Sequence, residues 1–315
     1  MNDAMTASPP QGPLLLPSYV LITPARNEAR LIEQTIASVL AQTALPLRWV
    51  IVSDGSTDGT DAIVQHHAGL HPWIMLVRRP ESEERSFAGK VRAFNAGLET
   101  LDNLRHDVIG NLDADITFDA GYFEYLMGQF ARDPRLGVCG TPFREGKVQY
   151  DYRYTNIEHV SGACQMFRRT CFEDIGGYQP IKGGGIDWIA VTTARMRGWH
   201  TRTFCEQACF HHRPIGTAQS SQLVARFRLG KKDYALGGHP LWQVVRSAYQ
   251  LRKKPVFLGG VFLLAGYVWA RVTRCERIAS AELVSFHRQE QLSRLRAATR
   301  TQLGRFTGRA RKGTA

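Results

Sequence analysis

The chain has 315 residues, of which 43 % are hydrophobic and 10 % aromatic, and its formal net charge is +12. This composition excludes an intrinsically disordered chain and predicts a globular protein with a sizeable core. The first twenty residues have no basic start and no long apolar run, so we expect a flexible leader at 1–18 and neither a signal peptide nor a membrane anchor there.

The first half of the chain predicts strands that alternate with helices. β-Branched and apolar runs predict strands at 19–25, 48–53, 74–79 and 107–116, the last of which ends on the acid pair Asp113 and Asp115. Apolar residues at helical spacing predict helices between them, within 27–43, 60–70 and 89–101. Strands and helices joined by short polar turns are typical of βαβ units. We therefore expect an α/β fold with a mostly parallel sheet and flanking helices.

Polar clusters lie at the carboxyl ends of three of these strands, at Thr23–Glu28, Asp54–Asp58 and Asp113–Asp115. Ligands of parallel sheets bind beyond the carboxyl ends of the strands, where these clusters fall. Asp113 and Asp115 are two residues apart, so in extended chain both side chains point to the same side. Two carboxylates that close repel unless a cation lies between them. The alternative is an Asp-rich turn exposed to solvent.

The next part of the chain predicts a strand and a helix within 161–178, and then a Gly-rich loop that leads into a second helix. Asp187 falls in the first turn of that second helix. An aspartate at this position either caps the helix, where the helix dipole favours it, or performs chemistry.

Six cysteines are spread through the chain without any C-x-x-C pair. Because no secretory signal is expected, six cysteines in a chain of this size predict reduced thiols in the cytosol. A metal site built from Cys205, Cys209, His211 and His212 is an alternative, but its spacing matches no common structural zinc site.

The composition changes near Gln219. Residues 225–315 contain 19 Lys and Arg against 4 Asp and Glu, whereas residues 1–224 contain 21 and 24. Such asymmetry favours an anionic partner, either nucleic acid or a lipid headgroup layer. Apolar and aromatic residues lie among the basic ones, so helices here would carry apolar stripes beside basic ones. The last thirty residues predict a basic helix.

Residues 255–270 form a run of sixteen residues without a charge. As a helix this run is about 24 Å long, short of the roughly 30 Å of a hydrocarbon core. It predicts an interfacial or re-entrant segment, with a buried core helix as the alternative.

Several motifs occur together in a recognisable order: TPARNE, VSDGSTDGT, GKVRAFNAG, DADI, SGACQMFRR and GIDW. In this order they resemble the motifs of a family 2 glycosyltransferase with the GT-A fold, from about Tyr19 to His212. Two positions depart from the family pattern. Ser53 stands where the family has the first Asp of D-D-G-S, and Ile186 stands where it has the Glu of G-E-D-W.

The resemblance implies an inverting, nucleotide-sugar-dependent enzyme of the type that builds bacterial cell-surface polysaccharides or glycolipids. The donor-binding residues that it implies are Thr23, Pro24, Glu28, Asp54, Lys90, Asp113 and Gly162. For a divalent metal, Mn²⁺ or Mg²⁺, it implies Asp115 together with His211 or His212. Asp187 would be the catalytic base and Trp188 an acceptor contact.

Each of these roles also makes chemical sense. A diphosphate leaving group gains charge as the glycosidic bond breaks, and a hard cation on the acid pair would neutralise that charge. A carboxylate such as that of Asp187 would accept the proton of the acceptor hydroxyl. Purely structural roles are the alternatives: Lys90 as an ordinary lysine at the start of a helix, Trp188 as a packing residue, and the His pair as surface residues.

These observations predict three regions: a leader at 1–18, a GT-A catalytic domain at 19–218, and a basic helical region at 219–315 that associates with a membrane. No Q-x-x-R-W motif follows Asp187 and no series of spans is visible, so we expect transfer of a single sugar. The expected acceptor is a lipid-linked or cell-envelope saccharide. We expect a cytoplasmic protein, peripheral or monotopic at the inner face of the cell membrane, with the anionic surface of that membrane as a partner.

Three other functions fit the sequence less well. A nucleic-acid-binding protein with a GT-A-like fold would bind through the basic region 219–315. No nucleic-acid-binding motif is present there, so we expect no such partner. A nucleotidyltransferase would need a Gly-rich signature at its N-terminus, which TPARNE does not supply. An inactive family member would be expected to have lost acids that this chain retains, namely Asp54, Asp113, Asp115 and Asp187.

Overall fold

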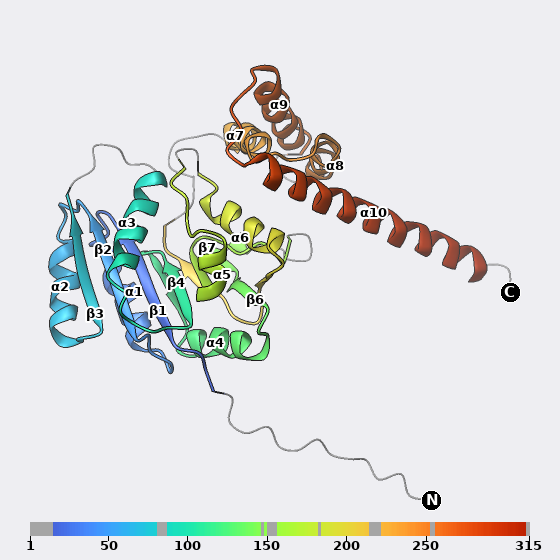
Figure 1. Cartoon of the computed structure of the whole chain (residues 1–315). Coiled ribbons are helices and arrows are strands. Elements are labelled where there is room, and N and C mark those ends of the chain that lie inside the picture. Colours follow the sequence, from blue (N-terminus) through green and yellow to red (C-terminus); the bar gives the residue numbers. More distant parts are fainter. Residues whose placement is uncertain are drawn as a thin grey trace, which may run out of the picture. The chain divides into compact units, whose positions relative to one another are not determined.

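The computed structural model of the chain describes residues 15–80, 87–145, 148–149, 156–181, 184–213, 222–252 and 256–312 (Figure 1). The described residues fall into two compact units. The N-terminal unit holds those up to 181 together with Ile186–Arg213, and the C-terminal unit holds Gly184, Gly185 and those from 222 onward. Most of the predicted leader and the composition change near Gln219 lie outside the described residues.

The N-terminal unit alternates strands and helices, as the sequence predicts. Its strands are β1 (Tyr19–Ala25), β2 (Arg48–Asp54), β3 (Ile74–Arg79), β4 (Val108–Leu112), β5 (Ile116–Phe118), β6 (Leu136–Gly140), β7 (Phe143–Glu145), β8 (Val148–Gln149), β9 (Cys164–Arg168), β10 (His200–Thr203) and β11 (Cys209–His211). Its helices are α1 (Ile32–Leu40), α2 (Thr60–Leu70), α3 (Phe87–Glu99), α4 (Tyr122–Arg132), α5 (Arg169–Asp174) and α6 (Ile186–Met196).

Seven strands form the main sheet, in the order β10-β6-β9-β4-β1-β2-β3. All of them run in one direction except β9, which is antiparallel to both of its neighbours. The predicted mostly parallel sheet is therefore confirmed. Because β9 runs against β4, the start of β9 lies beside the end of β4, with Leu112 opposite Cys164.

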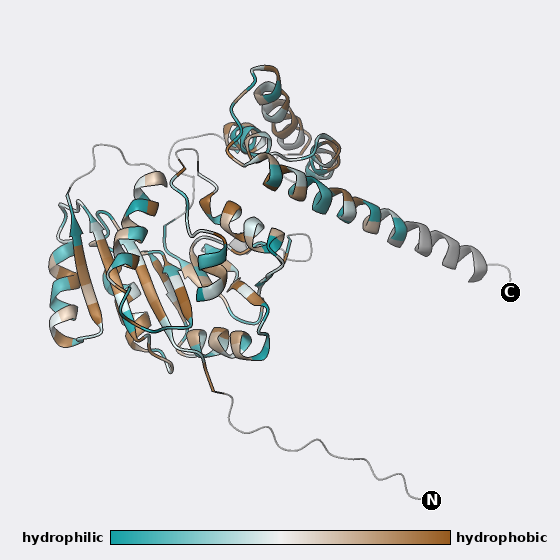
Figure 2. Ribbon diagram, in the orientation of Figure 1, coloured by the Kyte–Doolittle hydropathy of each residue, from teal (hydrophilic) through white to brown (hydrophobic). Residues whose placement is uncertain are grey.

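Helices cover both faces of this sheet (Figure 1). Alternate residues of β1 point to opposite faces: Leu21 belongs to a core with α1, α2 and α4, and Ile22 to a core with α3, α5 and α6. Figure 2 shows the central strands as the most hydrophobic part of this unit. Buried on both faces, such strands are near-continuous apolar runs, which is why the sequence reveals them so clearly.

A second, smaller sheet has the order β5-β11-β7-β8. Strand β11 pairs antiparallel with β5, so that His211 lies opposite Ile116, the residue that follows Asp115. It also pairs in parallel with β7, with Phe210 opposite Arg144. These pairings bring residues 143–145 and 209–211 to the acid pair that follows β4.

The C-terminal unit is helical, with α7 (Gln222–Ala235), α8 (Pro240–Gln250), α9 (Leu258–Val272) and α10 (Ala281–Lys312). Helices α7 and α9 cross at glycines. A Cβ atom on Gly230 would lie 2.0 Å from the carbonyl oxygen of Leu263, and one on Gly266 would lie 2.0 Å from that of Phe227. Within the described residues, no helix combines the length and the apolar character needed to cross a bilayer.

Candidate active site

The carboxyl ends of β1, β2 and β4 meet at one edge of the main sheet, where the register places Ala25 beside Ser53 and Ile22 beside Asn111. A pocket of about 240 Å³ lies at this edge. Its lining includes six residues predicted from the sequence: Pro24, Glu28, Asp54, Lys90, Asp113 and Asp115. The three polar clusters of the sequence therefore converge on one pocket.

Asp113 is held at the junction of β4 and β9. Its backbone N–H donates to the carbonyl oxygen of Ala163 at 2.9 Å, and its carboxylate accepts a hydrogen bond from the Lys90 ammonium. Burial alone would lower the pKa of Lys90, but contact with Asp113 and the nearby carboxylate of Asp187 hold that pKa above its ordinary value. Lys90 is therefore a cation at neutral pH.

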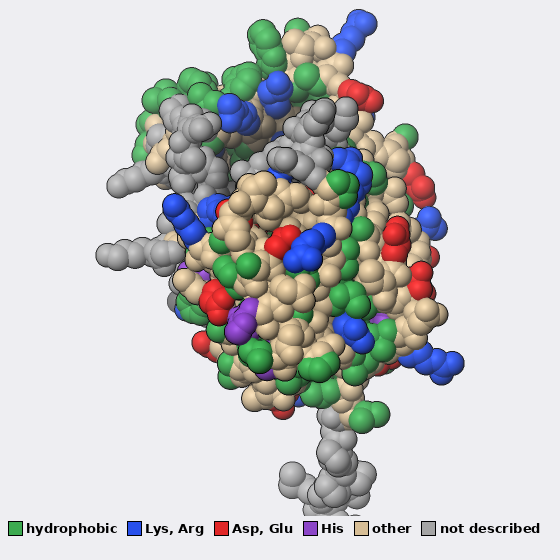
Figure 3. All heavy atoms as spheres, turned by 90° about the vertical axis from the view of Figure 1, so that its left-hand side faces the viewer, with side chains coloured by type: hydrophobic (Ala, Val, Ile, Leu, Met, Phe, Trp, Pro, Cys, Tyr) green, Lys and Arg blue, Asp and Glu red, His purple; other side chains and the backbone are tan. Residues whose placement is uncertain are grey.

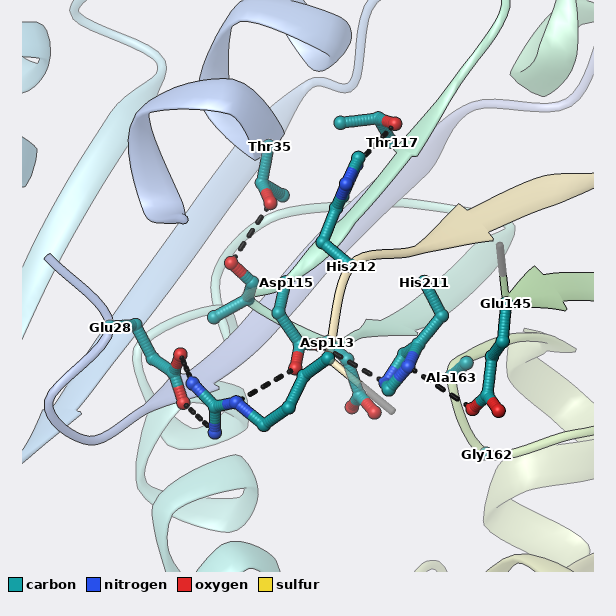
Figure 4. Close-up of polar contacts among 12 residues, drawn as sticks. Glu28, Thr35, Asp113, Asp115, Thr117, Glu145, Gly162, Ala163, His211 and His212 are labelled. Atoms are coloured by element: carbon teal, nitrogen blue, oxygen red, sulfur yellow. Dashed lines mark hydrogen bonds and ion pairs between the residues drawn. The ribbon is translucent and has the colours of Figure 1, made fainter. Parts of the chain in front are cut away.

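Asp115 faces His211, as Figure 4 shows. The Nε2 atom of His211 lies 3.5 Å from Oδ1 of Asp115, and its Nδ1 atom lies 3.4 Å from Oε1 of Glu145. The His211 side chain is only 7 % exposed. Its imidazole is thus set between two carboxylates, one on each ring nitrogen.

His212 is directed elsewhere. Its Nε2 atom lies 2.8 Å from the Thr117 hydroxyl, and its backbone N–H donates to the carbonyl oxygen of Asp115 at 3.0 Å. The sequence could not decide which of the two histidines would hold the metal. His211 is the one whose imidazole lies at the acid pair.

Asp113, Asp115 and His211 each offer one ligand atom, and these atoms lie within 4.8 Å of one another. In the described part of the chain this is the only His, Cys, Asp or Glu cluster of that kind. Two carboxylate oxygens and one imidazole nitrogen suit a divalent cation such as Mn²⁺. The residues present therefore fit a metal. The alternative site with Cys205 and Cys209 is not among the clusters of the described residues, and Cys205 is exposed whereas Cys209 is buried.

Asp187 lies in the first turn of α6, against Gly162. A Cβ atom on Gly162 would be 3.2 Å from Cβ and 3.4 Å from Oδ2 of Asp187. The carbonyl oxygen of Gly162 accepts a hydrogen bond of 2.9 Å from the Asn111 side chain, which ties this turn to β4. Trp188 follows on α6 and is half-buried.

Thr23 does not line the pocket. Its side chain is fully buried, and its hydroxyl accepts a hydrogen bond of 2.9 Å from the indole N–H of Trp49. The assignment of Thr23 to donor binding therefore finds no support in the direction of its side chain.

Comparison with known families agrees with this arrangement. The sequence model described as glycosyl transferase family 2 matches residues 20–176, about half of the chain. The chain belongs to glycosyl transferase family 2. The matched segment runs from β1 to the end of α5 and includes the acid pair, Lys90 and Gly162.

Curated relatives of this family 2 chain are poly-β-1,6-N-acetyl-D-glucosamine synthases. The protein of Staphylococcus epidermidis is 20 % identical over 274 residues, which cover 79 % of this chain and 61 % of the relative. That of Staphylococcus aureus strain COL is 25 % identical over 170 residues, 48 % of this chain and 39 % of the relative. The chain thus spans about six tenths or less of the length of these relatives.

Solved structures with a similar fold include a mannosyltransferase of Pyrobaculum calidifontis in complex with GDP-Man and Mn²⁺. It has a TM-score of 0.54 at 22 % identity, covering 90 % of this chain and 81 % of the other. The Staphylococcus aureus protein TarS (1–349) with UDP-GlcNAc has a TM-score of 0.52 at 13 % identity, covering 86 % and 78 %. These likenesses show that the family 2 domain has the GT-A fold that its motifs imply.

Three charged residues of the family 2 site are absent from the sequence predictions. Arg213 pairs with Glu28, and Arg79 with Asp54 at 3.0 Å, so each of these acids has a guanidinium partner. Glu145 contacts His211. Arg79 ends a predicted strand and would have been found by asking which residue lies beside Asp54. Arg213 and Glu145 carry no local signal, because pairing within the small sheet brings them to the site.

Proposed function

We propose that the chain is an inverting glycosyltransferase that moves one sugar from a nucleotide-diphosphate sugar to an acceptor hydroxyl. The observation that carries this proposal is the convergence of Asp113, Asp115 and His211 with the Lys90 ammonium at one pocket, with Asp187 nearby. A pocket with a carboxylate-rich metal site and fixed cations suits a diphosphate, whose charge must be balanced on binding and as the bond breaks.

The donor is proposed to bind across the edge of the main sheet. Pro24, Glu28 and Asp54 would contact the base and ribose, and Lys90 would contact the base or the diphosphate. Asp115 and His211, with Asp113 beside them, would hold Mn²⁺ or Mg²⁺. When bound, this cation supplies positive charge that stabilises the diphosphate as a leaving group.

Asp187 is proposed as the catalytic base. Its carboxylate would accept the proton of the acceptor hydroxyl while that oxygen bonds to the anomeric carbon. The bond between the anomeric carbon and the diphosphate oxygen breaks with its electron pair on the diphosphate, so no covalent sugar–enzyme intermediate is needed. Gly162 leaves room for this carboxylate, and Trp188 would stack on the acceptor.

The acceptor is proposed to be a lipid-linked or cell-envelope saccharide at the cytoplasmic face of the membrane. The names of the curated relatives support a cell-envelope role, since they synthesise poly-β-1,6-N-acetyl-D-glucosamine. The 19 basic residues among 225–315 support a location at an anionic surface. Transfer of one sugar is proposed because no Q-x-x-R-W motif follows Asp187.

Calorimetry tests the donor site. UDP, GDP and dTDP are titrated into the full chain with and without Mn²⁺, and again into Asp115→Ala. We expect metal-dependent binding of one nucleotide that is lost in Asp115→Ala and kept in the control Asp102→Ala, an exposed aspartate away from the pocket. If no nucleotide binds under either condition, the proposal is wrong and the chain is a binding protein or an inactive family member.

Asp187→Asn tests the base separately from the donor site. The variant should keep the nucleotide affinity of the wild type, because Asp187 is absent from the lining of the donor pocket. Transfer to an acceptor should fall by about 10²–10⁴-fold, the usual contribution of general base catalysis. Unchanged transfer would mean that another residue accepts the proton.

A further inference from the structure

Helix α8 turns its apolar side outward. Its exposed residues include Leu241, Val244, Val245 and Tyr249, which are 52 %, 51 %, 45 % and 38 % exposed. Their spacing places them on one helical face. The opposite face is polar and buried, and consists of Gln243, Ser247 and Gln250. A helix in water normally has the reverse arrangement.

Helix α9 also presents an apolar face to the outside. Its large exposed residues are Leu258, Val261, Val268, Trp269 and Val272. The glycines of the helix are buried, and Gly260 lies against the backbone of Ser247 on α8. In Figure 3, hydrophobic side chains gather at the top of the view, which shows the C-terminal unit. The exposed faces of α8 and α9 are called the apolar surface below.

Basic residues border the apolar surface and acidic ones are absent from its helices. Arg252 is exposed and lies in the turn that follows α8, where its backbone N–H donates to the carbonyl oxygen of Tyr249 at 3.3 Å. Arg271 and Arg274 are exposed at the end of α9. Neither α8 nor α9 contains Asp or Glu. Exposed arginines therefore follow α8 and lie at the end of α9, where they outnumber the one exposed acid nearby in the chain, Glu276.

We propose that the apolar surface inserts into the boundary between headgroups and acyl chains of an anionic bilayer, with Arg252, Arg271 and Arg274 at the level of the phosphates. The fifteen residues of α9 span about 22 Å as a helix, too short for a hydrocarbon core of about 30 Å, so α9 lies along the membrane. Trp269 and Tyr249 are of the type that gathers at membrane interfaces.

A second copy of the chain fits this surface less well. In a two-fold dimer the same patch meets itself, so the arginines of both copies would be brought to one interface. No acid on α8 or α9 would compensate them, whereas lipid phosphates would. The arginines beside the apolar surface therefore favour an anionic bilayer over a second copy of the chain as the partner.

The inference deepens the location given under the proposed function by naming the surface that binds. Its test needs neither donor nor acceptor, so a failure here is distinguishable from a failure of the transferase proposal. The full chain is mixed with vesicles of phosphatidylcholine alone, or with about one third phosphatidylglycerol, and the bound fraction is measured by flotation. We expect binding to the anionic vesicles.

Two sets of variants separate insertion from attraction by charge. The first is a triple serine variant, which combines Val244→Ser, Val261→Ser and Trp269→Ser. It should bind anionic vesicles at least tenfold more weakly, because each substitution removes apolar surface. Arg252→Gln, Arg271→Gln and Arg274→Gln together should remove the preference for anionic lipid, at roughly fivefold per charge.

A matched control changes Leu45→Ser and Leu70→Ser, which are 48 % and 61 % exposed on the N-terminal unit, and should bind vesicles as the wild type does. Circular dichroism checks that every variant is folded. The proposal is overturned if the wild type does not bind anionic vesicles. It is also overturned if sedimentation shows a dimer that the serine variant turns into a monomer, because the apolar surface then joins two copies.

Discussion

Arg213 lies on Glu28, a residue 185 positions earlier in the chain, and binds it through both terminal guanidinium nitrogens. The Nη1–Oε1 distance is 3.1 Å, and Nε of the same side chain lies 3.8 Å from Oδ2 of Asp115. Lys90 and Arg79 similarly face Asp113 and Asp54. The acids of the pocket therefore have cationic partners that an incoming cation must compete with.

This arrangement predicts opposite effects of Arg213→Gln on two ligands. Removing the guanidinium leaves the charges of Asp115 and Glu28 less compensated, so Mn²⁺ alone should bind about tenfold more tightly. A nucleoside diphosphate without metal should bind about tenfold more weakly, because a cation that can reach its phosphates is lost. Calorimetry of each ligand alone measures both. Arg78→Gln, whose ion pair with Asp61 lies outside the pocket, is the matched control.

Gly162→Ala is expected to displace the Asp187 carboxylate, since the added methyl group would lie 3.2 Å from its Cβ atom. A misplacement of this kind costs up to about a hundredfold in rate, so transfer should fall while nucleotide affinity is kept. Gly121→Ala is the control, because nothing lies within 4 Å of its added methyl group. Equal transfer rates in the two variants would argue against a role for Asp187 at this position.

Glu145→Gln should weaken metal binding by about 10- to 100-fold, because the Glu145 carboxylate lies 3.4 Å from Nδ1 of His211 and helps to orient the imidazole toward the acid pair. The binding of Mn²⁺ to the full chain is followed by electron paramagnetic resonance, which does not depend on transfer. Glu173→Gln removes an exposed carboxylate from an ion pair with Arg169 and serves as the control. His211→Ala should lose at least as much affinity as Glu145→Gln, and a smaller loss would contradict the proposed arrangement.

Thr23→Val is expected to act on stability and not on the donor. It leaves the buried indole N–H of Trp49 without its acceptor, which costs about 1–3 kcal/mol of unfolding free energy. Urea denaturation measures this loss, and calorimetry should find the nucleotide affinity unchanged. Thr23→Ser keeps an acceptor and should recover most of the stability. A large loss of nucleotide affinity in Thr23→Val with little change in stability would restore the role implied by the family motif.

The strands of the main sheet could be predicted because β1, β2 and β4 are buried on both faces and appear as unbroken apolar runs. The convergence of Asp54, Asp113 and Glu28 followed from their places at the ends of parallel strands. The direction of β9 could not be predicted, since a short apolar run looks the same in either orientation. Its antiparallel course is what brings Gly162 and Ala163 beside Asp113.

The buried face of α8 in the C-terminal unit could not be predicted from the sequence. The stripes of α8 are visible in the sequence, but amphipathic spacing does not say which stripe faces water. If the helix were assumed to lie in water, Val244 and Val245 would be predicted to be buried and Gln243 to be exposed. The structure has the opposite arrangement.

The reversed faces of α8 also have a thermodynamic consequence. Within the described residues, the hydroxyl of Ser247 and the amide nitrogen of Gln250 are buried without a hydrogen-bond partner, while valines on the other side contact solvent. Both features oppose folding of this helix in water. A ligand that binds only the folded form raises its stability by mass action. A lipid surface that covers these valines would therefore act as a stabilising ligand of the C-terminal unit, and the melting temperature of that unit would depend on the lipid concentration.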